Sequence, residues 1–230
     1  MGYLLLGALG HDLRNPLGAV MHSAQILLVE NAPERALKRI SSSSKRMAAM
    51  ISDLLDFVRT PLGEHLPVAC APMSVREAYQ MAIDEIAVIY PHRTFSFDPQ
   101  EDLVGNWDGA RISQMLSNLV GNAAEHGSSD TPILVSCYEF DGHVCIEVQN
   151  QGPPIPQNEQ RRIFEPMARG PSEMREGRYR GRNLGLGLNI AFVIAKAHGG
   201  TIELGSSKKT GTTFIVRLPR KPRDRNAWIQ

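Results

Sequence analysis

Three cysteines and almost no net charge limit what this 230-residue chain can be. The cysteines, Cys70, Cys137 and Cys145, form no metal-binding or redox motif. The formal net charge of +1 gives no overall attraction to nucleic acid or to a membrane surface. No apolar run reaches the length of a membrane span, and the segment 3–9 is short and lacks the basic leader of a signal peptide. We expect a cytoplasmic protein that does not bind nucleic acid.

Cysteine spacing also argues against a disulfide. Cys137 and Cys145 flank the dipeptide 141–142, Asp-Gly, which is typical of a two-residue hairpin turn. In that register residue 140 pairs with 143, 137 with 146 and 138 with 145. The two thiols are then neither opposite each other nor on the same face of the sheet. Unpaired cysteines fit a reducing cytosol.

The first quarter of the chain has the period of two helices. Residues 3–29 carry apolar side chains from Leu6 to Leu27 in steps of three and four, and residues 36–58 repeat the pattern. The sequence 31–33, Asn-Ala-Pro, separates them and predicts an antiparallel helical hairpin. Such a hairpin has too little core to stand alone, so we expect a homodimer that forms a four-helix bundle.

A proline lies inside the first of these predicted helices. Pro16 removes a backbone hydrogen bond to the carbonyl of residue 12 and is expected to bend the helix there. The bend is either a tolerated irregularity or a local adaptation beside a site that meets two partners, and both readings remain open.

Beyond residue 60 the pattern changes to mixed helix and strand. We predict helices over 74–90, 110–126 and 186–198, strands over 93–98, 133–140, 143–149, 201–206 and 213–218, and an irregular stretch over 166–183. The fold class is therefore α+β in two domains, a helical hairpin followed by an α/β sandwich with its helices on one face. The predicted boundaries are 1–60 for the helical domain, 61–66 for a linker, 67–219 for the sandwich and 220–230 for a solvated basic tail.

Two clusters in the second half have residues that suit a nucleotide and its metal ion. Asn118 and Asn122 share one helix face, and their amide oxygens suit Mg²⁺, although one of them could equally be a cap or a core amide. The segment 150–156, Asn-Gln-Gly-Pro-Pro-Ile-Pro, follows a predicted strand and could present polar groups to a base, or could be an ordinary turn.

Two further clusters suit phosphates. The stretch 166–183 is long, irregular and rich in arginine. The segment 183–189, Asn-Leu-Gly-Leu-Gly-Leu-Asn, places glycines ahead of a helix, where backbone N–H groups can approach phosphate. A dinucleotide-binding fingerprint is rejected because these glycines follow a long loop rather than the first strand of a βαβ unit.

A candidate nucleophile lies in the first predicted helix. His11 is followed at once by Asp12, an arrangement in which an acid can orient the imidazole ring. His22 lies on a similar helix face, but a serine follows it. Most exposed helix histidines have no chemical role, so His11 gains its interest from the phosphate-binding clusters downstream.

Taken together and in this order, the clusters resemble the core of a bacterial sensor histidine kinase, from about residue 4 to residue 219. Residues 11–16 resemble the H box, 118–122 the N box, 150–152 and 185–187 the two glycine boxes, Phe164 the F box, and 211–214 the closing glycine-threonine turn. The resemblance implies a Bergerat-type ATP-binding sandwich that uses ATP and Mg²⁺.

The resemblance also implies roles for individual residues. His11 would accept the γ-phosphoryl group, Asp12 would orient its ring, Asn15 would position a water for dephosphorylating the partner, and Arg169 would offset phosphate charge. Asn122 would bind Mg²⁺. The implied nucleotide-binding residues are Asn118, Asn122, Glu125, His126, Asn150, Gly152, Ile155, Phe164, Arg182, Leu184, Gly185, Leu186, Gly187, Leu188 and Thr212.

Three positions depart from the family pattern. Asn150 replaces an aspartate that accepts a hydrogen bond from adenine, Glu125 stands where many members have a lysine, and Asn183 replaces a glycine. The amide oxygen of Asn150 can still accept that bond, whereas its nitrogen facing the base would repel it. These departures bear on affinity and rate more than on function.

The expected function is autophosphorylation of His11 followed by phosphotransfer to an aspartate in the receiver domain of a response regulator, with possible phosphatase action on that regulator. The gyrase and chaperone ATPases of this fold place a glutamate base four residues before the Mg²⁺ asparagine, where this chain has Asn118, which cannot act as a base. A dimerising module with a degenerate nucleotide site, or one dominated by phosphatase action, is the other alternative. Only ten residues precede His11, so we expect a sensor domain to be missing.

Overall fold

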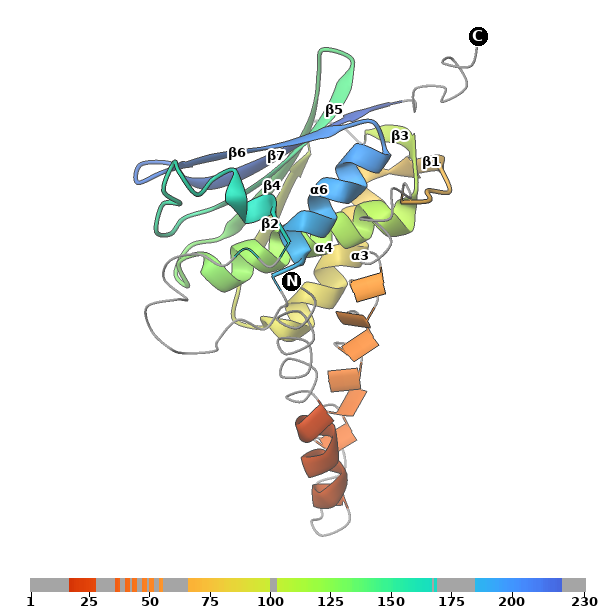
Figure 1. Cartoon of the computed structure of the whole chain (residues 1–230), viewed down its shortest axis with the longest axis vertical. Coiled ribbons are helices and arrows are strands. Elements are labelled where there is room, and N and C mark those ends of the chain that lie inside the picture. Colours follow the sequence, from red (N-terminus) through yellow and green to blue (C-terminus); the bar gives the residue numbers. More distant parts are fainter. Residues whose placement is uncertain are drawn as a thin grey trace.

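The computed structural model describes the sandwich and part of the helical hairpin (Figure 1). The described residues are 17–27, 36–37, 40–41, 43–44, 47–48, 50–51, 54–55, 66–99, 103–166, 168 and 185–220. The predictions for His11, Asp12, Asn15, Pro16, Arg169, Arg182, Asn183, Leu184, the linker residues 61–65 and the tail from 221 onward lie outside them. Where the hairpin is described it is helical, as expected. None of the helices in the described part of the chain has the length and apolar character that a membrane span requires.

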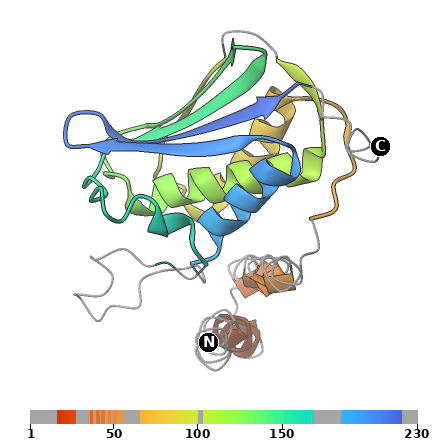
Figure 2. The same ribbon diagram turned by 45° about the horizontal axis from the view of Figure 1, so that its top comes forward.

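The sandwich consists of one five-stranded sheet with three helices on one face (Figures 1 and 2). The strand order is β2-β4-β5-β7-β6. The strands are β2 (Phe95–Pro99), β4 (Ile133–Phe140), β5 (His143–Asn150), β6 (Thr201–Ser207) and β7 (Gly211–Pro219). The helices are α3 (Val75–Ile89), α4 (Gly109–His126) and α6 (Gly187–Ala197), with a short 3-10 turn, η2 (Arg162–Phe164), before α6. This arrangement confirms the predicted fold class.

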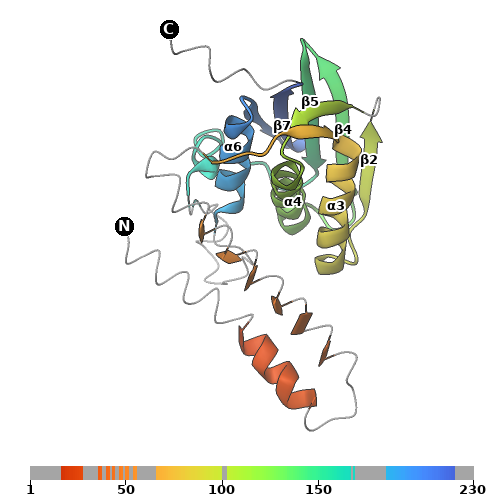
Figure 3. The same cartoon turned by 90° about the vertical axis from the view of Figure 1, so that its right-hand side faces the viewer.

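Helix α4 lies between α6 and α3, beneath the sheet (Figure 3). Its N-terminus is capped by Asp108, whose carboxylate accepts a hydrogen bond of 3.1 Å from the backbone N–H of Arg111. Its apolar face, which includes Ile112, Leu116 and Leu119, is fully buried in the core. Burying side chains of this size stabilises the fold by roughly 1.5–3 kcal/mol each. This helix carries the predicted asparagine cluster, so packing fixes its position.

The β4–β5 hairpin has the predicted register. Asp141 and Gly142 both have positive φ values, 50° and 71°, as a two-residue hairpin turn requires. Cys137 is opposite Ile146, and Cys145 is opposite Tyr138. All three cysteines, which lie among the described residues, are thiols rather than half-cystines.

The sequence-based prediction missed a second, two-stranded sheet. Strand β1 (Ala71–Ser74) pairs antiparallel with β3 (Val104–Trp107). The buried Trp107 donates a hydrogen bond of 2.8 Å from Nε1 to the carbonyl of Pro219. The small sheet is therefore attached to the end of β7. The prediction of a strand over 93–98 also named no partner strand, and in the structure β2 pairs parallel with β4.

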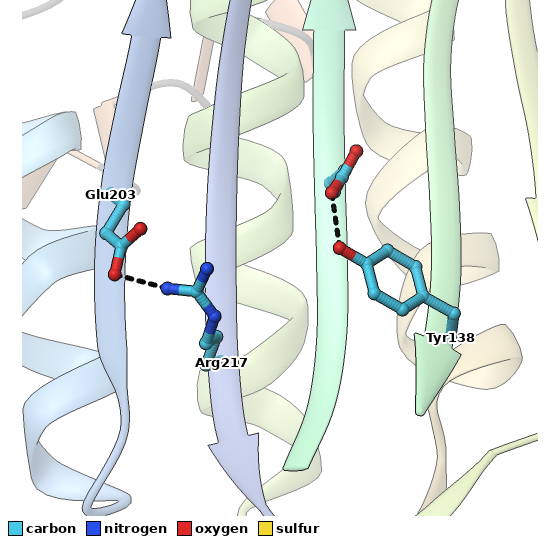
Figure 4. A network of polar contacts seen from close by, with 4 residues as sticks. Tyr138, Glu203 and Arg217 are labelled. Atoms are coloured by element: carbon cyan, nitrogen blue, oxygen red, sulfur yellow. Dashed lines mark hydrogen bonds and ion pairs between the residues drawn. The ribbon is translucent and has the colours of Figure 1, made fainter. Parts of the chain in front are cut away.

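The face of the large sheet opposite α3, α4 and α6 carries a polar network (Figure 4). The Tyr138 hydroxyl donates a hydrogen bond of 2.5 Å to the Glu147 carboxylate, and Arg217 pairs with Glu203. The bond to Glu147 raises the pKa of Tyr138 to about 12, with burial as a smaller cause. Burial raises the pKa of the neighbouring Cys145 thiol, which keeps it protonated and unreactive at neutral pH.

We expect Tyr138 to ionise late, with a midpoint near pH 12. Because its pKa is raised in the folded state, the stability that it contributes is complete below about pH 10, its unfolded value, and is lost as the pH rises towards 12. An ultraviolet titration of phenolate absorbance measures the midpoint. Glu147→Gln should return it towards about 10, and Tyr138→Phe should remove the late step. An unchanged midpoint in Glu147→Gln would rule out this cause.

Candidate functional site

Asn150, the last residue of β5, stands at one edge of the candidate site. Its side chain is 6% exposed, and it is paired with Thr212 of β7. Its Nδ2 donates a hydrogen bond of 3.2 Å to the carbonyl of Gln151, so Oδ1 is turned away from that carbonyl. The amide nitrogen is thus occupied by the chain's own backbone. The amide oxygen, which can only accept hydrogen bonds, is the atom that this orientation directs away from that carbonyl.

Three glycines surround Asn150 because a side chain at any of them would collide with its neighbours. A Cβ atom on Gly152 would lie 3.0 Å from the carbonyl oxygen of His126, and one on Gly127 would lie 3.1 Å from Cβ of Asn150. Gly211, with φ at 73°, lies against the Asn150 backbone. These contacts bring the end of α4, the first glycine cluster and the start of β7 together.

A hydroxyl network holds the segment that follows β5. The Thr212 hydroxyl, which is buried, lies 2.8 Å from the Ser206 hydroxyl. Ser206 Oγ in turn accepts a hydrogen bond of 2.9 Å from the backbone N–H of Ile155. Thus the predicted residues Asn150, Gly152, Ile155 and Thr212 do come together. Ser206, which belongs to none of the predicted motifs, joins them.

The asparagine cluster of α4 lies against the second glycine cluster. A Cβ atom on Gly187 would be 3.1 Å from Oδ1 of Asn118. Nδ2 of Asn118 is buried and has no hydrogen-bond partner among the described residues. Asn122, one turn further along α4, is half-buried. Such an unsatisfied amide is costly in a core and is expected where a ligand completes the site.

The second glycine cluster opens α6 without a side-chain cap. Gly185 has φ at 68°, a left-handed conformation that glycine adopts without strain. Leu186 is 1% exposed and provides no side-chain hydrogen bond at the start of the helix. Leu188 packs partly buried against the core. The two leucines therefore anchor the segment, and the backbone N–H groups of the first turn are the ones that suit phosphate.

Phe164 joins the core beside this helix. Its ring lies 6.0 Å from that of Phe192 and 6.2 Å from that of Phe214. Its carbonyl accepts a hydrogen bond of 2.9 Å from Nδ2 of Asn189, in the first turn of α6. Asn189 was not predicted as a site residue, although it directly follows the second glycine cluster. Its bond fixes the F-box position against the helix that the glycines open.

The last turn of α4 contributes two further predicted residues. Glu125 is half-buried and His126 is exposed. No group of three or more histidine, cysteine, aspartate or glutamate side chains that could hold a metal ion occurs in the described part of the chain. Magnesium bound to a nucleotide needs only one or two protein oxygens besides phosphate and water. The neutral amides of α4 fit that requirement.

Two parts of the chain match known protein families. Residues 107–222 match the family described as "Histidine kinase-, DNA gyrase B-, and HSP90-like ATPase". The sandwich is therefore an ATP-binding domain of that class. Residues 4–63 match the "His Kinase A (phospho-acceptor) domain". The chain belongs to the sensor histidine kinases, the protein-histidine kinases of two-component signal transduction, and contains the two domains of their catalytic core.

Curated relatives agree with this family. The chain is 33% identical over 218 residues to a bacteriophytochrome of Pseudomonas aeruginosa, covering 94% of this chain and 29% of the relative. It is 33% identical over 214 residues to the probable sensor histidine kinase TcrY of Mycobacterium tuberculosis, covering 91% and 44%. The chain thus spans less than half the length of these two relatives.

Solved structures share the fold. The catalytic domain of histidine kinase ThkA has a TM-score of 0.55 at 28% identity and covers 67% of this chain and 97% of that domain. Full-length ShkA in complex with AMPPNP has a TM-score of 0.64 at 22% identity and covers 93% of this chain and 45% of ShkA. At this identity the second likeness shows a shared fold alone.

Gly187→Ala tests the contact between the two clusters. The added methyl group would crowd Oδ1 of Asn118, and we expect affinity for Mg²⁺-ATP to fall by about tenfold, the equivalent of ~1.4 kcal/mol. Alanine favours a helix over glycine by up to about 1 kcal/mol, so loss of α6 would not explain the result. Calorimetric titration measures the affinity. Gly205→Ala, where no atom lies within 4 Å, is the control; equal affinities for the two variants would contradict the prediction.

Proposed function

We propose that this chain transfers the γ-phosphoryl group of ATP to His11 and then to an aspartate in a response-regulator receiver domain. The observation that carries the proposal is the contact between Asn118 and Gly187, which brings the N box and the second glycine box together. The match of residues 4–63 to a phosphoacceptor domain supplies the acceptor on the same chain. A nucleotide site and a histidine acceptor together support phosphoryl transfer.

The proposed reaction needs a nucleophilic imidazole. Nε2 of His11 attacks the γ-phosphorus, the bond from that phosphorus to the β–γ bridging oxygen breaks, and ADP leaves with the electron pair. Asp12 accepts a hydrogen bond from Nδ1–H and offsets the positive charge that develops on the ring. The aspartate of the regulator then attacks the phosphohistidine, which regenerates the imidazole. Arg169 is proposed to offset phosphate charge, and Asn15 to position the water that hydrolyses the phosphorylated regulator.

We assign the nucleotide to the residues that meet around α4 and the ends of β5 and β7. Asn150 and Thr212 would face the base, and the first turn of α6 would face the phosphates, with Arg182 and Leu184 in the segment before it. Asn122 would bind Mg²⁺, with Asn118 beside it, because amide oxygens are neutral hard ligands. Bound Mg²⁺ neutralises part of the phosphate charge.

The helical domain is proposed to dimerise. Five large apolar side chains among its described residues are exposed: Leu17, Met21, Leu37, Ile51 and Leu55. Burying them between two copies would complete the four-helix bundle. We retain the boundaries 1–60, 61–66, 67–219 and 220–230, since β7 ends at Pro219. Cysteines kept as thiols are consistent with a reducing compartment, and we propose that the core acts in the cytoplasm.

Hydrolysis of ATP without phosphoryl transfer is the less favoured reaction. It would require a base four residues before Asn122 on the same helix face, and that position is Asn118. An amide cannot accept a proton from water at neutral pH.

Phosphorylation of His11 can be tested with γ-labelled ATP. We expect label on the chain that is stable in base and labile in acid. His11→Gln should remove it, because the acceptor nitrogen is lost, and His22→Gln should keep it. Label that survives in His11→Gln would refute the assignment.

Asn15→Ala should keep the label on His11 while dephosphorylation of the regulator is lost.

Asn122→Ala tests the metal-nucleotide site. Losing the amide oxygen should lower affinity for Mg²⁺-ATP by at least tenfold, about 1.4 kcal/mol, in calorimetry. Affinity for ATP with Mg²⁺ removed should change much less, because the amide is assigned to the metal. Asn106→Ala, in β3, is the matched control. The same loss with and without Mg²⁺ would argue against a metal role for Asn122.

A further inference from the structure

Arg93 occupies a junction that neither the sequence motifs nor the proposed mechanism uses. Its backbone N–H donates a hydrogen bond of 3.1 Å to the carbonyl of Tyr90, at the end of α3. The next residue, Thr94, accepts a hydrogen bond of 2.9 Å from the N–H of Ile133, at the start of β4. The backbone at Arg93 and Thr94 is therefore fixed between the end of α3 and the sheet.

The Arg93 side chain binds two carbonyls at the far end of α4. Nη2 donates a hydrogen bond of 3.1 Å to the carbonyl of Ala123, and Nη1 donates one to the carbonyl of Ser128. These oxygens lie on either side of the point where α4 ends, and a positive charge at a helix C-terminus is favourable. A planar guanidinium can hold two carbonyls in a fixed geometry, whereas a lysine ammonium acts as a single point charge.

The same side chain contacts the turn that connects α4 to the first glycine box. A Cβ atom on Gly127 would lie 2.6 Å from Nη2 of Arg93 and 3.1 Å from Cβ of Asn150, so the three residues meet in the space of one methyl group. Ser128 then donates a backbone hydrogen bond of 2.7 Å to the carbonyl of Gln151. A continuous series of contacts therefore runs from Arg93 through this turn to Asn150 and Gln151.

The hydrogen-bonding groups of the Arg93 side chain are only partly satisfied. Its Nε is buried and has no hydrogen-bond partner within the described residues. An unsatisfied buried donor lowers the net stability that the side chain provides. The hydrogen bonds to the carbonyls of Ala123 and Ser128 therefore account for the position of the guanidinium, although Nε is left without a partner.

We propose that Arg93 is a positioning residue for nucleotide binding. By fixing the turn 127–128 it sets the spacing between Asn150 and the last turns of α4, which carry Asn122 and Glu125. In this assignment Arg93 shapes the nucleotide site and takes no part in the transfer of the phosphoryl group. Its effect therefore falls on the affinity for the nucleotide. The identity of the ligand as ATP rests on the function proposed above, whereas the coupling of Arg93 to Asn150 rests on the contacts alone.

The test uses the full chain and two readouts, the dissociation constant of fluorescent trinitrophenyl-ATP and the KM and kcat of autophosphorylation. Arg93→Lys and Arg93→Ala should raise the dissociation constant and KM by about five- to tenfold, as expected for loss of charge-assisted hydrogen bonds. The value of kcat should stay within about twofold, because no transition-state contact is removed. Millimolar methylguanidinium should restore affinity to Arg93→Ala but not to Arg93→Lys, whose side chain fills the site.

Arg220→Ala is the matched control. Arg220 also donates to a backbone carbonyl, that of Val104, and pairs with Glu139, but it lies at the end of β7 away from Asn150. This variant should keep wild-type affinity. If Arg93→Ala does not fold, Arg93→Lys and Gly127→Ala decide. The added methyl group of Gly127→Ala would lie 2.5 Å from the carbonyl oxygen of Ala123 and 2.6 Å from Nη2 of Arg93, so it should part the guanidinium from that carbonyl and weaken affinity to a similar extent.

Two outcomes would overturn the inference. One is an unchanged dissociation constant in Arg93→Lys despite a lowered melting temperature, which would make Arg93 a structural cap. The other is a fall in kcat at constant KM. A wild-type chain that binds the fluorescent nucleotide without labelling His11 would defeat the proposed function, and the dissociation constants would still decide the role of Arg93.

Discussion

Helix α4 buries its apolar face against the sheet while its sides contact α3 and α6. Each fully buried side chain of this face contributes roughly 1.5–3 kcal/mol, so the helix cannot rotate or slide without losing several such contributions. The two asparagines of α4 lie on the same rigid element as this apolar face. Hydrophobic packing thereby fixes the helix that holds Asn118 against Gly187 of the second glycine box. The orphan amide nitrogen of Asn118 persists because that packing outweighs its cost.

Periodicity was sufficient to predict the elements with strong local signals. The helix around Asn118 begins and ends within one residue of its expected bounds, and the register of the β4–β5 hairpin follows from its Asp-Gly turn. Strands β1 and β3 could not be predicted in this way, because they are four residues long and contain Pro72, Gly105 and Asn106, which are residue types that strands disfavour. Pairing of β5 with β7 and of β2 with β4 depends on contacts distant in sequence, which local patterns do not encode.

The residues of the candidate site likewise include some that local motifs predict and some that only tertiary contacts reveal. Motif order and spacing predicted Asn118, Asn150, Gly187 and Thr212 as nucleotide-binding residues, and the fold places Asn118 against Gly187 and Asn150 opposite Thr212. No motif in the sequence marks the residues that support them. Ser206 reaches Ile155 across 51 residues, Arg93 reaches Ser128 across 35, and Asn189 reaches Phe164 across 25. A serine, an arginine and an asparagine are ordinary surface residues until tertiary contacts select them, so only the structure could assign them.

The position of β7 has a consequence for how the protein is made. Although β7 is the last strand among the described residues, it lies between β5 and β6 and not at an edge of the sheet. The ribosome therefore releases this interior strand after both of its neighbours in the sheet. Until then β5 and β6 have no strand between them, and Thr212, which faces Asn150 in the completed sheet, has not been positioned. Residues 4–63, which match the phospho-acceptor domain, precede every strand of this sheet in the chain, so they are synthesised before the nucleotide-binding sandwich can close.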